Sequence, residues 1–152
     1  MQPLATAVRA RSRLLFPSLA GLYATLAGPS VFLMRAIAGI TLAVHGWPKI
    51  QDPFKSIDLV EGLGFVPGAL WSPLLAGTEF FGGILLAIGF LTRPAALGAT
   101  IVLLVTAWFH WLVRDQGFGG AEKSLLWAAL TFYFVARGGG FLSVDRALRK
   151  EI

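Results

Sequence analysis

Two side chains of opposite charge stand inside long apolar stretches and are the first candidates for chemistry. Arg35 interrupts the apolar stretch 30–47, and Glu79 lies within the stretch 69–92. An isolated charge in a bilayer is costly, so such residues usually pair with one another or line a functional cavity. A helical rise of about 1.5 Å per residue puts Glu79 about 15 Å and Arg35 about 18 Å from the expected outer ends of these stretches. We therefore expect an Arg35–Glu79 ion pair inside a helix bundle.

The Arg35–Glu79 pair has two interpretations. It can be a structural ion pair that fixes how two helices dock, or it can anchor a polar headgroup such as that of a quinone, with Glu79 as the proton acceptor. The two interpretations do not exclude each other. We expect Arg35 and Glu79 to bind a ligand in the middle of the membrane, and the residues identify no catalytic group.

The two histidines form a second candidate group. His45 closes the first apolar stretch, and His110 lies near the end of a later one, so both imidazoles are expected on the same outer side of the membrane. Histidines from two helices can ligate haem, but hydrogen bonding at the membrane interface explains them more simply, so haem is not the favoured cofactor. Lys49 and Glu122 are expected on that side too. We expect His45, Lys49, His110 and Glu122 to ring the outer mouth of a ligand-binding cavity, although a carboxylate in the first turn of a helix can also simply complement its dipole.

Four apolar stretches must position these side chains. The stretch 94–113 contains twenty residues without Asp, Glu, Lys or Arg, which is about what a helix needs to cross ~30 Å of hydrocarbon. The predicted fold class is all-α, a four-transmembrane-helix bundle. Its spans are expected at 30–47, 69–92, 94–113 and 120–136.

The segment 14–28 is apolar but only fifteen residues long, and Pro17 lies near its start. It is too short for a span, so we expect an N-terminal interfacial helix that ends where Gly28 and Pro29 break the chain. We see no linker, so residues 1–152 are expected to form one membrane domain.

The distribution of basic residues predicts the orientation of this domain. One side of the expected bundle carries eight: Arg9, Arg11, Arg13, Arg93, Arg137, Arg146, Arg149 and Lys150. The other side carries four: Lys49, Lys55, Arg114 and Lys123. The positive-inside rule therefore predicts that both termini are cytoplasmic, in a multi-pass protein of the bacterial inner membrane.

Composition excludes several classes of function. The 152 residues are 56% hydrophobic and 14% charged, and the thirteen Lys and Arg that produce a net charge of +5 are scattered, so no nucleic-acid surface is expected. The chain has no cysteine, which excludes disulfides, thiolate metal sites and redox-active thiols. No metal site is expected, and any redox role must use a bound or partner-supplied cofactor.

Several short motifs occur together in one order along the chain. They are Arg35 with Gly39; His45, Gly46 and Lys49; Gly64, Phe65 and Pro67; Glu79 with Gly82 and Gly83; Gly89, Thr92 and Arg93; and Gly119, Gly120 and Glu122. Together they resemble the DoxX family of small four-helix bacterial membrane proteins over roughly residues 30–145. The Glu-x-x-Gly-Gly segment followed by Thr-Arg is the most specific part.

The resemblance implies a role in electron transfer. By this likeness the characteristic polar positions are Arg35, Lys49, Glu79, Arg93 and Glu122. The family takes its name from a subunit of a quinone-linked terminal oxidase, and relatives are associated with thiosulfate-to-quinone electron transfer and membrane oxidoreductase complexes. We therefore expect a quinone-interacting accessory subunit of a bacterial inner-membrane oxidoreductase system, and activity of the chain alone is left open.

Two other functions remain open alternatives: a non-catalytic structural scaffold for a membrane complex, and a haem-binding electron carrier. The expected partners are the lipid bilayer and a protein of a membrane complex. A second copy of the chain is a further expected partner, because the glycine-rich second span can pack within its own bundle or against another copy.

Overall fold

A computed structural model describes residues 14–149 of the chain. All regular structure in this part is helical, without strands. Three stretches are long and apolar enough to cross a membrane: Pro17–Gln51, Gly68–Ile88 and Thr92–Val113. The all-α fold class is therefore confirmed. Arg9, Arg11, Arg13 and Lys150, which contribute to the charge count, lie outside the described residues.

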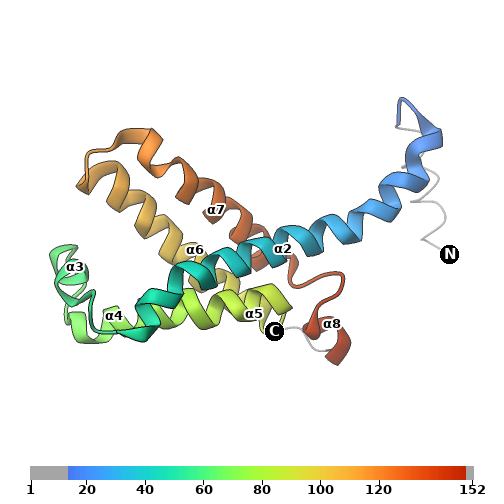
Figure 1. Cartoon of the computed structure of the whole chain (residues 1–152). Helices are drawn as coiled ribbons and strands as arrows, with labels where there is room; N and C mark the ends of the chain where they lie inside the picture. The colour runs from blue at the N-terminus through green and yellow to red at the C-terminus, as the bar shows by residue number, and fades with distance from the viewer. Residues whose placement is uncertain (1–13, 150–152) are drawn as a thin grey trace.

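The first helix is longer than the sequence predicts. After a 3₁₀ turn at Pro17–Leu19, α2 runs without interruption over Ala20–Gln51 (Figure 1). The expected break between an interfacial helix at 14–28 and a span at 30–47 is therefore wrong. Pro29 lies inside α2. A proline removes one backbone donor and restricts the preceding turn, but membrane helices tolerate it because neighbouring groups satisfy the freed backbone atoms.

The exit of α2 is also later than expected. Pro48 lies inside the helix, and α2 ends at Gln51. The helix thus extends four residues beyond Trp47, which adds about 6 Å to its length. This extra turn changes which residues of the first two membrane helices lie at the same level.

The second membrane helix contains an irregular turn. It is built from α4 (Gly68–Gly77), a π-helical turn η2 (Thr78–Gly82) and α5 (Gly83–Ile88). The short helix α3 (Ile57–Gly62) precedes it in the connection from α2. These bounds lie within four residues of the expected span 69–92.

The third and fourth long helices pack along each other. The third consists of α6 (Thr92–Trp108) and a π-helical turn η3 (Phe109–Val113), and the fourth is α7 (Gly117–Arg137). Figure 1 shows α6 and α7 side by side, with the short helix α8 (Val144–Leu148) after the turn that follows α7. The fourth long helix begins three residues before the expected stretch 120–136.

Glycines bring α2 and the second membrane helix into backbone contact. A Cβ atom added at Gly39 would lie 2.3 Å from the backbone nitrogen of Ala87, and one at Gly83 would lie 2.5 Å from that of Ala43. Only glycine permits this approach, as in other close-packed membrane helices. This contact fixes the position of α2 along the axis of α5.

The buried core is a small apolar plug contributed by four helices. It consists of Ala38, Leu86, Ala95, Ala96 and Phe134, each no more than 9% exposed. On α2 the plug residue Ala38 lies between Arg35 and His45, and on α6 Ala95 and Ala96 lie between Thr92 and Thr106, so the plug separates polar residues near one end of the bundle from polar residues near the other. The two polar regions are the places to look for function.

Candidate ligand-binding cavity

Arg35 and Glu79 do not meet, so the expected ion pair is wrong. The Arg35 guanidinium donates to the backbone carbonyls of Gly139 and Leu142, the latter at 2.8 Å, while Glu79 forms an ion pair with Lys49. On the second helix, the residue next to Arg35 is Gly89. A Cβ atom added at Gly89 would lie 2.7 Å from Arg35 Cζ. Gly89 is ten residues after Glu79, or about 15 Å along a helix.

The error comes from the assumed end of α2. Arg35 lies sixteen residues from Gln51, which is about 24 Å, whereas Glu79 lies eleven residues from Gly68, which is about 16 Å. The two charges therefore sit at different levels of the bundle. Each charge therefore contacts groups at its own level of the bundle.

Arg35 belongs to a cluster that we call the C-terminal clamp, formed by Arg35, Thr92, Ser143, Asp145 and the backbone of 139–142. Asp145 carries the network across to α6. Its Oδ1 accepts from the backbone N–H of Leu91 at 2.8 Å, and its Oδ2 accepts from the backbone N–H of Thr92 at 3.0 Å and from the Thr92 hydroxyl at 2.6 Å. Its own N–H donates to the carbonyl of Gly89 at 2.9 Å.

The electrostatics of the C-terminal clamp favour an ionised Asp145. Burial acts to raise the pKa of this carboxyl, but the hydrogen bonds from Thr92 and Leu91 and the positive charge of Arg35 outweigh it and hold the pKa below its ordinary value. The carboxylate also faces the N-terminus of α6, where negative charge is favoured. Because the terminal nitrogens of Arg35 and both oxygens of Asp145 are bonded within the protein, we assign the C-terminal clamp a structural role.

The other polar region surrounds a cavity of about 570 Å³ on the opposite side of the plug. Side chains from α2, η2, α6, η3 and α7 line it. The polar lining residues are Thr41, His45, Lys49, Glu79, Thr106, His110, Gln116, Lys123, Ser124 and Thr131. The apolar wall includes Leu42, Leu103 and Trp127. The volume is typical of cavities that bind small molecules.

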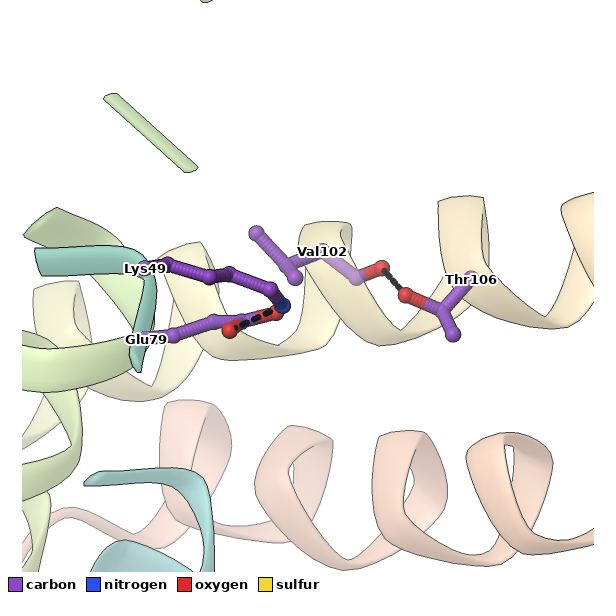
Figure 2. A network of polar contacts seen from close by, with 4 residues as sticks. All are labelled: Lys49, Glu79, Val102 and Thr106. Atoms are coloured by element: carbon purple, nitrogen blue, oxygen red, sulfur yellow. Dashed lines mark hydrogen bonds and ion pairs between the residues drawn. The ribbon is translucent and has the colours of Figure 1, made fainter. Parts of the chain in front are cut away.

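The Lys49–Glu79 ion pair is positioned by backbone contact and helix direction. A Cβ atom added at Gly46 would lie 2.4 Å from the backbone nitrogen of Phe80, so α2 and η2 touch beside the pair. Side chains of a helix lean toward its N-terminus, which directs Lys49 from the last turn of α2 back into the bundle. Figure 2 shows the Lys49 and Glu79 side chains meeting beside α6, where the Thr106 hydroxyl donates to the carbonyl of Val102 at 2.8 Å.

The exposure of the pair is asymmetric. The Glu79 side chain is 7% exposed, whereas the Lys49 side chain is 35% exposed. The carboxylate is therefore shielded, and the ammonium group lies toward the opening of the cavity.

Both π-helical turns carry an ionisable residue of the cavity. Glu79 lies in η2 and His110 lies in η3. His110 Nδ1 is 2.7 Å from Gln116 Oε1, in the turn that leads into α7. π-Helical turns are rare and recur at functional sites because the extra residue re-aims side chains. Both π-helical turns contribute to the lining of this cavity, and neither contributes to the C-terminal clamp.

The cavity is closed at its inner end by paired hydroxyls above the plug. Thr131 lines the cavity, and its Oγ1 lies 2.8 Å from Thr100 Oγ1. Both threonines are buried and also bond to helix carbonyls. Residues 14–149 contain no group of three or more His, Cys, Asp and Glu side chains arranged to hold a metal ion.

The structure brings together three of the four residues expected at the outer mouth. His45, Lys49 and His110 line the same cavity, and Glu79 joins them there. Glu122 does not: it is exposed and outside the lining, while its neighbour Lys123 lines the cavity. Successive residues of a helix point about 100° apart, and the lining face of α7 includes Lys123 and Ser124, so Glu122 lies beyond the edge of that face.

Sequence reasoning missed the uncharged part of the site on α7. Gly120, Ser124, Trp127 and Thr131 all line the cavity. Their spacing of four, three and four residues is that of one helix face. A search for polar and small residues on one face of an otherwise apolar helix would have found them.

Comparison with known proteins identifies relatives along most of the chain. A family model described as DoxX matches residues 30–111. An Escherichia coli protein named "Inner membrane protein YqjF" is 34% identical over 123 residues, covering 80% of this chain and 93% of that protein. A Bacillus subtilis protein named "Putative oxidoreductase CatD" is 28% identical over 114 residues, covering 74% of this chain and 82% of that protein. No solved structure matches the chain.

Proposed function

Because this chain belongs to the DoxX family of membrane proteins, we propose that it is a quinone-interacting accessory subunit of an oxidoreductase system in the bacterial inner membrane. The observation that carries the proposal is the cavity that places a buried carboxylate, an ammonium group and two imidazoles against an apolar wall. The relatives named above as an inner membrane protein and an oxidoreductase agree with this role.

The chemistry of the cavity suits both redox states of a quinone headgroup. The oxidised ring presents carbonyl oxygens that accept hydrogen bonds, and Lys49 and a protonated imidazole are donors for them. The reduced ring presents hydroxyl groups that donate, and the Glu79 carboxylate is an acceptor for one of them. Trp127, Leu42 and Leu103 offer an apolar surface to the ring.

Glu79 is the residue best placed to exchange a proton with such a ligand. A carboxylate held by an ammonium group can accept a proton when a ligand hydroxyl approaches, and Lys49 then keeps the charge of the site positive. The chain has no cysteine, so electrons for quinone reduction or oxidation are exchanged with a redox centre of the partner oxidoreductase.

The proposal includes the orientation of the bundle. We propose that α7 is a fourth span and that both termini are cytoplasmic, which the larger number of Lys and Arg on the side of the termini supports. The opening of the cavity, near Lys49 and His110, then faces the outer side of the membrane.

A binding experiment on the purified protein tests the proposed ligand. We expect a short-chain ubiquinone or menaquinone analogue to bind, and Glu79→Gln to weaken binding by at least about fivefold, the scale of one charge-assisted hydrogen bond. Glu122→Gln is the matched control, because Glu122 is exposed and outside the cavity. An unchanged affinity in Glu79→Gln, or an equal loss in both variants, would contradict the proposal.

A structural scaffold is the second candidate function, and the C-terminal clamp is the observation that favours it. If the protein only holds a complex together, quinone analogues will not raise its thermal unfolding temperature, since only a ligand of the folded state stabilises it. A Soret band after haem reconstitution that is lost in both His45→Ala and His110→Ala would instead favour the haem-binding carrier.

A further inference from the structure

We infer that the cavity exchanges water and protons with one side of the membrane only, the side on which α3 and the turn between α6 and α7 lie. The inference rests on the proposed function only for the identity of the ligand whose protons are exchanged. Its basis is the order of three layers along the bundle: the open cavity, the apolar plug and the C-terminal clamp.

The same order occurs along the helices that build the site. On α5 and its preceding turn, Glu79 of the cavity is followed by Leu86 of the plug and then by Gly89 beside Arg35. On α7, Thr131 of the cavity is followed by Phe134 of the plug. With a rise of about 1.5 Å per residue, each change of layer takes about one or two helical turns.

On α2 and α6, which run in the opposite direction through the bundle, the same layers occur in reverse order along the sequence. On α2, Arg35 of the C-terminal clamp is followed by Ala38 and then by His45 and Lys49 of the cavity. On α6, Thr92 is followed by Ala96 of the plug. The layers are therefore continuous across the bundle and do not depend on one helix.

The two ends of the cavity differ in access. At the open end, His45 and Lys123 are exposed and Lys49 is partly exposed. At the closed end, Leu86, Ala96 and Phe134 are each 0% exposed, and the clamp covers them with Arg35, which is also 0% exposed. A water chain through this layer would have to cross close-packed apolar side chains, which offer it no hydrogen-bond partner. Protons for Glu79 and His110 therefore come from the open end.

The absence of cysteine makes the test direct, because each single-cysteine variant carries one thiol. Ser124→Cys and Thr41→Cys are two independent cavity probes on α7 and α2, at half-buried lining positions. Asp58→Cys in α3 and Ala147→Cys in α8 mark the two ends of the bundle at exposed positions. The full-length variants are treated with a charged, membrane-impermeant maleimide, in intact cells and in inverted membrane vesicles.

We expect both cavity probes to react from the side that labels Asp58→Cys, at a rate at least tenfold higher than from the side that labels Ala147→Cys. Comparable rates from both sides, or faster reaction from the Ala147→Cys side, would overturn the inference. So would an absence of labelling from both sides in variants that react after denaturation, because the cavity would then have no aqueous access.

A second variant tests whether the plug is the barrier. Adding Phe134→Ala to Ser124→Cys should allow labelling from both sides, whereas Leu126→Ala, on the exposed face of α7, should leave it one-sided. One-sided labelling in the Phe134→Ala protein would overturn the assignment of the barrier to the plug. A quinone analogue that fails to slow the labelling of Ser124→Cys would contradict the proposed function and leave one-sided access intact, so the two failures are distinguishable.

Discussion

Arg35 and Glu79 are both buried charges of membrane helices, and the comparison between them separates structure from function. Arg35 is 0% exposed, donates to the backbone carbonyls of Gly139 and Leu142, and does not line the cavity. Glu79 is held by a single partly exposed lysine and faces a cavity. A charge in a membrane helix therefore indicates function when it faces a cavity, and architecture when the protein itself encloses it.

The comparison predicts that removing Arg35 has the largest effect on stability. Arg35→Met should lower the free energy of unfolding by about 3 to 5 kcal/mol, because Asp145 and several carbonyls lose their buried partner. The measurement is thermal unfolding in detergent. Arg137→Met, at an exposed position, is the control and should leave the unfolding temperature nearly unchanged. Equal unfolding temperatures in the two variants would contradict the structural role of Arg35.

The backbone contact that sets the level of these charges should be the next most sensitive feature. Gly39→Ala should cost up to about 3 kcal/mol, because the new methyl group would lie 2.3 Å from backbone that cannot give way. Gly21→Ala, in the same helix with no atom within 4 Å, should leave stability unchanged or slightly raised. Thermal unfolding of both variants tests this, and no difference between them would mean that α2 and α5 are not in close contact.

The carboxylate of the C-terminal clamp should make stability depend on pH. The pKa of Asp145 is lowered in the folded protein, so its contribution is complete above the ordinary carboxyl pKa of 3.8 and is lost as the pH falls below that value. Asp145→Asn should cost about 2 kcal/mol at neutral pH. The difference in unfolding temperature between the wild type and this variant should shrink progressively as the pH is lowered below 3.8, and a constant difference would contradict the assignment.

A substitution in the Lys49–Glu79 pair should have the smallest effect on stability, and its main effect should be on ligand binding. Lys49→Gln should cost about 1 kcal/mol, because the amide of the new glutamine can still donate a hydrogen bond to the shielded Glu79 carboxylate. Its affinity for a quinone analogue should nevertheless fall, whereas Lys55→Gln, in the connection before α3, should change neither property. Paired unfolding and binding measurements decide this. A large loss of stability with normal binding would place the pair with the C-terminal clamp.

Much of the helical architecture follows from the apolar stretches alone. The stretch 94–113 is free of charge and forms one helix with its π-helical end, as expected. The ends of the first helix could not be predicted from proline positions, because neither Pro29 nor Pro48 terminates α2. In a membrane the alternative to a helix leaves backbone groups without partners, so the penalty for proline is outweighed.

The membership of the site was predictable in part, and its pairing was not. His45, Lys49 and His110 were expected together because they lie near the same ends of neighbouring helices, and the structure places them in one cavity. To predict whether Arg35 and Glu79 lie at the same level, the ends of both helices must be known to within one helical turn. The π-helical turns and the return of Asp145 to the start of α6 depend on tertiary contacts that leave no local signal.

The partners of Arg35 come from the far end of the chain, and this has a consequence for biosynthesis. Arg35 enters the bilayer with the first helix, while Gly139, Leu142 and Asp145 are made more than a hundred residues later. During that interval the guanidinium lacks the groups that compensate it in the finished protein, and an uncompensated charge favours water or headgroups over hydrocarbon. We therefore expect the first helix to reach its final depth only after residues 139–145 have been synthesised.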